Sequence, residues 1–199
     1  MFNYFSRFSI VLLFFIVICF IGLVFSLQSI EGFDLSENEN ITDMVVSSSG
    51  FIWPTPNYKA ITSPYGYRKA PTSGAGTFHG GVDIGAPAGA NIYSVFSGEV
   101  TYIGFSGANG YTVRVTSGDY TATYSHVSPY FLVYVGQHVN QGDIIANVGP
   151  KNVYDVPNNP YKDSSGNPTN GATTGPHLHF SLKINGISVN PLDYLYEQM

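Results

Sequence analysis

The chain of 199 residues has room for one ordinary domain plus extensions. Its 15 Tyr, 14 Phe and 22 Gly, against only 11% charged residues, favour a turn-rich β protein over a helical bundle. The formal net charge of −5 argues against a nucleic-acid partner, because nucleic-acid-binding domains are usually basic.

Residues 10–27 are apolar and uncharged over a length close to the ~20 residues that a membrane-spanning helix needs. Arg7 precedes this segment and acidic residues follow it, so the positive-inside bias places the N-terminus in the cytoplasm. We therefore expect residues 1–30 to form an N-terminal transmembrane helix, which makes the chain a single-pass cell-membrane protein with an extracytoplasmic domain. The alternative is a cleaved signal peptide, which would make the protein secreted.

Residues 31–50 are polar and acidic, and we expect them to form a flexible linker before a folded domain over residues 51–199. The single cysteine, Cys19, lies inside the apolar segment, so the exported part has neither a disulfide nor a thiol nucleophile. Its stability must therefore come from a hydrophobic core.

The rest of the chain predicts an all-β domain of short strands separated by turn signals such as Asn109-Gly110 and Asn185-Gly186. No window of about a dozen residues has convincing helical periodicity, so we expect only short helical turns at 129–131 and 191–196. The expected strands are 60–63, 91–95, 99–104, 111–116, 120–126, 144–148, 177–184 and 187–189.

Residues 151–174 form a long segment rich in Asn, Pro, Gly and Ser, without a strand or helix signal. Long structureless loops in compact domains tend to be functional. We interpret the segment as a wall or lid of a site, with a tolerated surface insertion as the alternative.

Four of the five histidines lie in segments that combine them with other polar groups. His79 and Asp83 are separated by Gly80-Gly81-Val82, and the adjacent glycines argue against a helix. On an extended or looped backbone these glycines let the chain bend, which brings the imidazole and the carboxylate together. Taken alone, such a motif is more often a satisfied polar pair than a metal site.

His177 and His179 stand one residue apart in the segment GPHLHF. Successive side chains of a β-strand point to opposite faces, so the two imidazoles share one face while Leu178 and Phe180 share the other. Two imidazoles side by side suit a metal ion, an acid/base pair or a merely polar sheet surface.

His126 ends the expected strand 120–126, and the alternation of side chains places it on the same face as Ala122 and Tyr124. His138 lies in a turn-like polar stretch with no partner in view, so we interpret it as exposed and incidental.

Together these residues offer what metal-assisted hydrolysis needs. Two histidines and one carboxylate are a common ligand set for catalytic zinc, with a fourth position left for water. The chain offers His79, Asp83 and His179 for this set. His126 and His177 remain as groups that accept a proton or hydrogen-bond a developing negative charge.

The motifs HGGVD, YSH and GPHLHF, in this order, resemble those of the M23 family of zinc metallopeptidases, the lysostaphin/LytM-type peptidoglycan endopeptidases. The flanking segments SPYGYR, VGQHVNQGDIIANVG and VNPLDYL fit the same family, so the resemblance covers about residues 61–195. The sequence departs from the family in the segment 151–174, where many relatives have a short turn of the Gly-x-Thr-Gly kind.

The resemblance implies a compact antiparallel β-sheet of the LytM/M23 peptidase type with a substrate groove over the sheet. It implies that His79, Asp83 and His179 bind Zn²⁺ and that His126 and His177 form the catalytic pair. The expected function is that of a zinc metalloendopeptidase, which hydrolyses peptide bonds in peptidoglycan stems or cross-bridges outside the cytoplasmic membrane.

Other functions stay open at this point. The chain could be a catalytically inactive M23-fold module that binds or regulates within a cell-envelope complex, although all five site positions are intact. A carbohydrate-binding β domain with incidental histidines would bind no metal. The same enzyme could also serve a phage or a mobile element as a wall-opening lysin.

Overall fold

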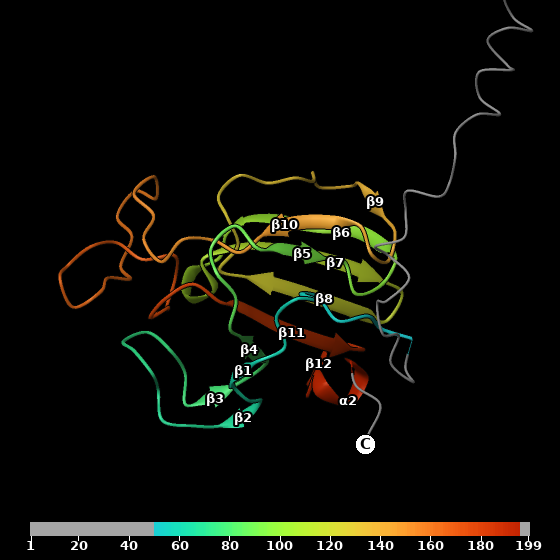
Figure 1. The fold of residues 1–199 in the computed structure, drawn as a ribbon, viewed down its shortest axis with the longest axis horizontal. Coiled ribbons are helices and arrows are strands. Elements are labelled where there is room, and N and C mark those ends of the chain that lie inside the picture. The colour runs from blue at the N-terminus through green and yellow to red at the C-terminus, as the bar shows by residue number, and fades with distance from the viewer. Residues whose placement is uncertain (1–49, 196–199) are drawn as a thin grey trace, which may run out of the picture. The chain divides into compact units, whose positions relative to one another are not determined.

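The computed structural model describes residues 50–195 (Figure 1). The expected transmembrane helix in residues 1–30 and residues 31–49 of the expected linker lie outside this range, so both stay predictions. Within residues 50–195, no helix combines the length and the apolar character that crossing a membrane requires.

Strands supply nearly all of the regular structure of the described residues, as expected for an all-β domain. Each predicted strand is present, with ends that differ from the prediction by no more than two residues. In chain order these strands are β1 (Ile61–Ser63), β5 (Asn91–Tyr93), β6 (Gly98–Phe105), β7 (Tyr111–Ser117), β8 (Tyr120–Ser125), β10 (Ile144–Asn147), β11 (Leu178–Ile184) and β12 (Ile187–Val189).

Short elements account for the differences from the sequence-based expectation. Four strands of two or three residues were not predicted, because each is too short to show an alternating pattern: β2 (Gly66–Tyr67), β3 (Phe78–His79), β4 (Val82–Ile84) and β9 (His138–Val139). A short 3₁₀ helix, η2 (Gly107–Asn109), was also missed.

One of the two expected helical turns is present, as α2 (Leu192–Leu195). The expected helical turn at 129–131 is wrong, since these residues adopt an irregular path. There the Tyr130 backbone N–H donates to the Ser128 hydroxyl at 3.2 Å.

The main sheet is antiparallel throughout and has the strand order β1-β4-β11-β8-β7-β6-β9, with β12 added beside β11 (Figure 1). Two further ladders, β5 with β10 and β2 with β3, stand outside this order. The apolar side chains of Ile92 in β5 and Ile145 in β10 join those of the main sheet in one core, so this ladder covers the apolar face of the sheet.

The two faces of the main sheet differ in chemistry. On one face, the cross-strand neighbours Val113, Tyr124 and Phe180 are all fully buried. The next residues along the same three strands, Arg114, Thr123 and Ser181, are also cross-strand neighbours, and they give the opposite face its polar character. The strict alternation of β-strands therefore separates a packed core from an open polar surface, and the candidate site lies on the polar surface.

Tyr124 ties the core to the segment that follows β5. Its hydroxyl accepts a hydrogen bond from the Val95 backbone N–H at 2.9 Å, with both groups buried. We expect Tyr124→Phe to lower the free energy of unfolding by about 1–3 kcal/mol, because the buried N–H loses its partner. Urea unfolding followed by the fluorescence of the single tryptophan, Trp53, measures this change.

Tyr130→Phe is the matched control, because Tyr130 is 82% exposed. Equal free energies of unfolding for the two variants would contradict the structural role of the Tyr124 hydroxyl.

Candidate metal centre

His79 and Asp83 come from β3 and β4, two short strands separated by Gly80-Gly81. A Cβ atom at Gly81 would collide with the Phe180 carbonyl oxygen and lie 3.0 Å from Cε1 of His179. Glycine at this position therefore allows β4 to approach β11 closely. The resulting register pairs Asp83 with His179, which places the carboxylate and the imidazole side by side across two strands.

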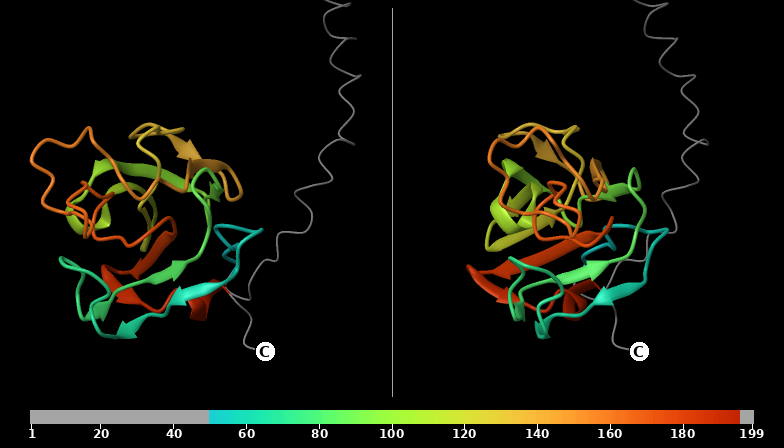
Figure 2. Two further views of the ribbon diagram at one scale, coloured as in Figure 1. Left: turned by 60° about the vertical axis from the view of Figure 1, so that its left-hand side comes forward. Right: turned by 90° about the vertical axis from the view of Figure 1, so that its left-hand side faces the viewer.

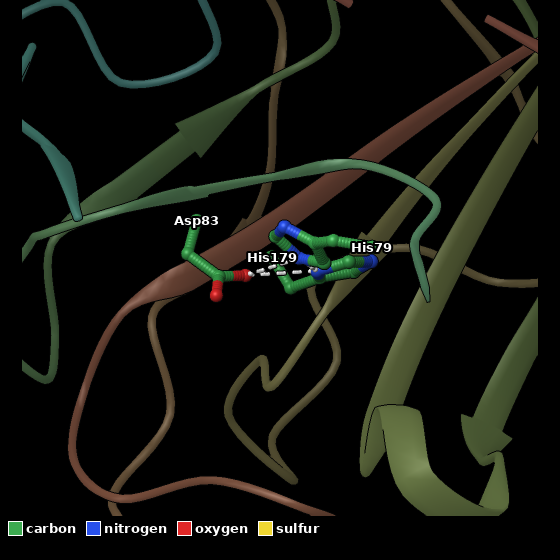
Figure 3. Close-up of side chains that lie close together, drawn as sticks. All are labelled: His79, Asp83 and His179. Carbon is green, nitrogen blue, oxygen red and sulfur yellow. Dashed lines mark hydrogen bonds and ion pairs between the residues drawn. The ribbon is translucent and has the colours of Figure 1, made fainter. Parts of the chain in front are cut away.

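Candidate ligand atoms of His79, Asp83 and the distant His179 meet at this point (Figure 3). Asp83 Oδ1 lies 3.1 Å from His79 Nε2 and 2.8 Å from His179 Nδ1. The two nitrogens lie 2.9 Å from each other. These separations are close to the ~3.3 Å between ligand atoms that a tetrahedral zinc site with bonds of ~2.0–2.1 Å requires.

The hydrogen bond on the far side of His79 shows that this arrangement suits a cation. His79 Nδ1 lies 2.8 Å from the Pro64 carbonyl oxygen, which accepts but cannot donate, so Nδ1 carries the proton. In the neutral ring, Nε2 then presents a lone pair to Asp83 Oδ1. Two acceptors at this distance repel each other unless they share a proton or a metal ion. The residues present therefore fit a divalent metal such as Zn²⁺.

Burial and charge both shape the titration of the ligands. Burial raises the pKa of Asp83, but its close contacts with the imidazoles of His177, His179 and His79 outweigh that effect and bring this pKa far below its usual value. Burial lowers the pKa of His179, against the opposing attraction of Asp83. Asp83 is thus ionised and His179 favours its neutral form, and metal binding needs both of these forms.

The second oxygen of Asp83 is held by Arg68, a residue that the sequence analysis missed. Arg68 Nη1 lies 3.0 Å from Asp83 Oδ2 and also donates to the Ser63 hydroxyl. This contact leaves Oδ1 directed at the histidines. The only signal in the sequence was the position of Arg68 in SPYGYR, which the family resemblance marks as a flank without a role.

His126 reaches the site in a way that the alternation of side chains did not predict. The strand β8 ends at Ser125, and His126 has a φ of 59°, in the left-handed region that non-glycine residues rarely adopt. This turn takes the ring out of the core face of Ala122 and Tyr124. Its centroid lies 4.6 Å from that of His177 and 6.1 Å from that of His179.

A backbone carbonyl fixes the orientation of His126. Its Nδ1 donates to the Asn170 carbonyl oxygen at 2.7 Å. Burial, together with the neighbouring His177 and His179, lowers the pKa of His126 to about 3, so the ring is neutral. The lone pair of this neutral ring therefore resides on Nε2.

Asn170, which the sequence analysis also missed, joins the end of the segment 151–174 to the loops around the site. Its side chain accepts from the Tyr111 N–H at 2.8 Å and donates to the Val127 carbonyl oxygen at 2.9 Å. The side chain is fully buried. An asparagine in a polar loop gives no sign of such a role, because both of its partners are backbone groups.

Of the two remaining histidines, His177 lies at the site and His138 does not. His177 Nδ1 donates to the Gly175 carbonyl oxygen at 2.9 Å, and its Nε2 lies 3.5 Å from Asp83 Oδ1. His138 is exposed in β9 and does not line the site. The structure thus brings His79, Asp83, His126, His177 and His179 together and leaves His138 apart.

The five side chains lie in a cleft of about 690 Å³. The β2–β3 hairpin and the segment 151–174 stand on either side of β11 (Figures 1 and 2). Of that segment, only residues 172–174 line the cleft. Such a cleft can hold an extended chain across three candidate metal ligands and two further histidines, an arrangement that suits the hydrolysis of a polar bond.

Arg68 gives a test of the ligand geometry that needs no substrate. We expect Arg68→Gln to weaken the affinity for Zn²⁺ by roughly 10–100-fold, because the carboxylate loses the partner that orients it. Competition with a chromophoric chelator measures this affinity. Arg114→Gln is the control, since Arg114 stacks on Tyr102 instead. Equal affinities for the two variants would contradict the role of Arg68.

Comparison with known proteins agrees with this geometry. Residues 77–191 match the family described as peptidase family M23. DD-carboxypeptidase/endopeptidase Mpg of Neisseria meningitidis is 31% identical over 136 residues, which are 68% of this chain and 27% of Mpg. Peptidoglycan DD-endopeptidase ShyC of Vibrio cholerae is 29% identical over 137 residues, 68% of this chain and 27% of ShyC. This chain thus spans about a quarter of the length of these relatives.

Solved structures are also similar. The catalytic domain of lysostaphin from Staphylococcus simulans superimposes with a TM-score of 0.54 at 26% identity, over 69% of this chain and 92% of that domain. A zinc-containing peptidase from Vibrio cholerae gives a TM-score of 0.54 at 26% identity, over 73% of this chain and 44% of that one. The resemblance seen in the sequence is confirmed, and the chain belongs to peptidase family M23.

Proposed function

We propose that this protein is a zinc-dependent endopeptidase that cleaves peptide bonds in the stems or cross-bridges of peptidoglycan. The observation that carries the proposal is the meeting of Asp83 Oδ1, His79 Nε2 and His179 Nδ1 within 3.1 Å of one another, beside two further histidines. The similarity to a zinc-containing peptidase and to a peptidoglycan DD-endopeptidase supports the choice of metal and substrate.

The chemistry divides between the metal and the two histidines that do not bind it. A zinc ion held by His79, Asp83 and His179 would supply a Lewis acid and would lower the pKa of water enough to make a nucleophile available at neutral pH. His126 and His177 each donate through Nδ1 to a backbone carbonyl oxygen, which leaves Nε2 as the atom of each ring that can accept a proton. They can therefore take up the proton released in the attack and, once protonated, hydrogen-bond the oxygen of the scissile carbonyl.

The setting of the reaction forms part of the proposal. The uncharged apolar residues 10–27 and the preceding Arg7 support an anchor in the cytoplasmic membrane with the catalytic domain outside it. A peptidase at that position faces the cell wall, where its substrate lies.

Two of the alternatives are less well supported than catalysis. Histidines that were incidental to a carbohydrate-binding domain would have no reason to converge on one carboxylate. An inactive module of the same fold would tolerate the loss of a ligand or of a catalytic histidine, whereas this chain has all five groups in one cleft.

The ligand set predicts a paired loss of metal and activity. We expect His179→Ala in residues 51–199 to bind less than one equivalent of zinc and to release no muropeptides from purified peptidoglycan, because two ligands remain. Elemental analysis and chromatography of the soluble products measure both quantities. The control is His138→Ala, at the exposed histidine. A His179→Ala variant that cleaved as well as the parent would contradict the proposal.

Substitution of His126 or His177 should lower activity without removing the metal. We expect His126→Ala and His177→Ala to retain zinc while kcat falls by roughly 10²–10⁴-fold, because proton transfer and charge stabilisation are lost but the ligands stay. Zinc content and steady-state rates on the same muropeptide distinguish the two effects. Loss of zinc in parallel with activity would instead make these residues ligands.

A further inference from the structure

We propose that the cleft contains a binding site for a free carboxylate of the substrate peptide, formed by Lys183 on its floor and Lys69 on its wall. The inference rests on the proposed function and adds a specificity to it. The substrate class is a peptide with an acidic side chain or a free C-terminus near the scissile bond.

The distribution of charge in the cleft favours an anionic ligand. Three cationic side chains line it, those of Arg68, Lys69 and Lys183, whereas the only acidic side chain in its lining is that of Asp83. Asp83 is already occupied by Arg68 and the histidines. The cleft is therefore positive apart from any metal ion, and a bound divalent ion would add to this charge.

The ammonium groups of the two lysines have no ion-pair partner within residues 50–195. Neither ammonium group makes an ion pair with a carboxylate there, in contrast to Lys151, whose Nζ lies 3.1 Å from Asp163 Oδ2. Both lysines are exposed, so their charges are available to a ligand. An ammonium group is a compact charge with three donors, which suits a single carboxylate that approaches from solution.

The position of Lys183 on the sheet sets its distance from the candidate metal centre. His179, Ser181 and Lys183 alternate along β11 with the buried Phe180 and Leu182, so all three share the polar face. Four residues of an antiparallel strand separate the Cα atoms of His179 and Lys183 by ~13 Å. An extended peptide that follows β11 advances by ~3.4 Å per residue, and the lysine stem shortens the span. The carboxylate then lies about two to four residues from the scissile bond.

A pair of ligands that differ only in charge tests the site. The probes are a cross-linked muropeptide dimer and the same dimer with its free carboxylates converted to carboxamides. We expect the full-length protein to cleave the carboxylate form with a kcat/KM about two- to fivefold higher, the range that an exposed ion pair supports. This preference should decrease as salt is added, because exposed charges are screened.

The variants then assign the preference to particular side chains. Lys183→Gln should remove most of it by lowering kcat/KM for the carboxylate form alone, and Lys69→Gln should have the same effect to a smaller degree. The control is Lys59→Gln, at an exposed lysine outside the cleft, which should retain the full preference. A preference that persists in both Lys183→Gln and Lys69→Gln would overturn the inference.

Equilibrium binding separates this inference from the proposed function. In a His126→Ala background, in which we expect cleavage to be strongly slowed, calorimetry should show the same preference for the carboxylate form, and Lys183→Gln should remove it. Wild-type protein that cleaves neither dimer contradicts the proposed function alone if this binding preference is present. Cleavage of both dimers at equal rates, with equal affinities, contradicts the carboxylate site alone.

Discussion

The structure depends on one contact, the approach of Asp83 Oδ1 to nitrogen atoms of His79 and His179 at 3.1 and 2.8 Å. Carboxylate and imidazole acceptors at these distances repel each other unless they share a proton or a metal ion, so the arrangement suits a divalent cation. The register of β4 on β11 brings Asp83 opposite His179, and Gly81 permits the close approach of these two strands. Arg68 binds the second oxygen of Asp83 and thereby fixes the orientation of the carboxylate.

The alternation of side chains along the β-strands gives the two faces of the main sheet different roles. The face that carries Val113, Tyr124 and Phe180 packs the core, which keeps the strands rigid. The opposite face carries His179 and, further along β11, Lys183. Because both faces belong to the same strands, the rigidity of the core is transmitted directly to the positions of the ligands, as a preorganised site requires.

The sequence predicted those parts of the molecule that depend on local periodicity and on side-chain type. The eight predicted strands follow from alternation and turn signals, and the shared face of His177 and His179 follows from a spacing of two. The left-handed backbone of His126 was not predictable, since it departs from that alternation. Arg68 and Asn170 were missed because their partners are distant in the chain, as for Asn170 and the Val127 carbonyl oxygen, and no local pattern announces a contact of this kind.

The most direct test of the central claim is anomalous diffraction at the zinc absorption edge from crystals of residues 51–199 grown with zinc. We expect one strong peak about 2.0–2.2 Å from His79 Nε2, Asp83 Oδ1 and His179 Nδ1. A peak at another position, or a bound ion that lacks Asp83 among its ligands, would contradict it.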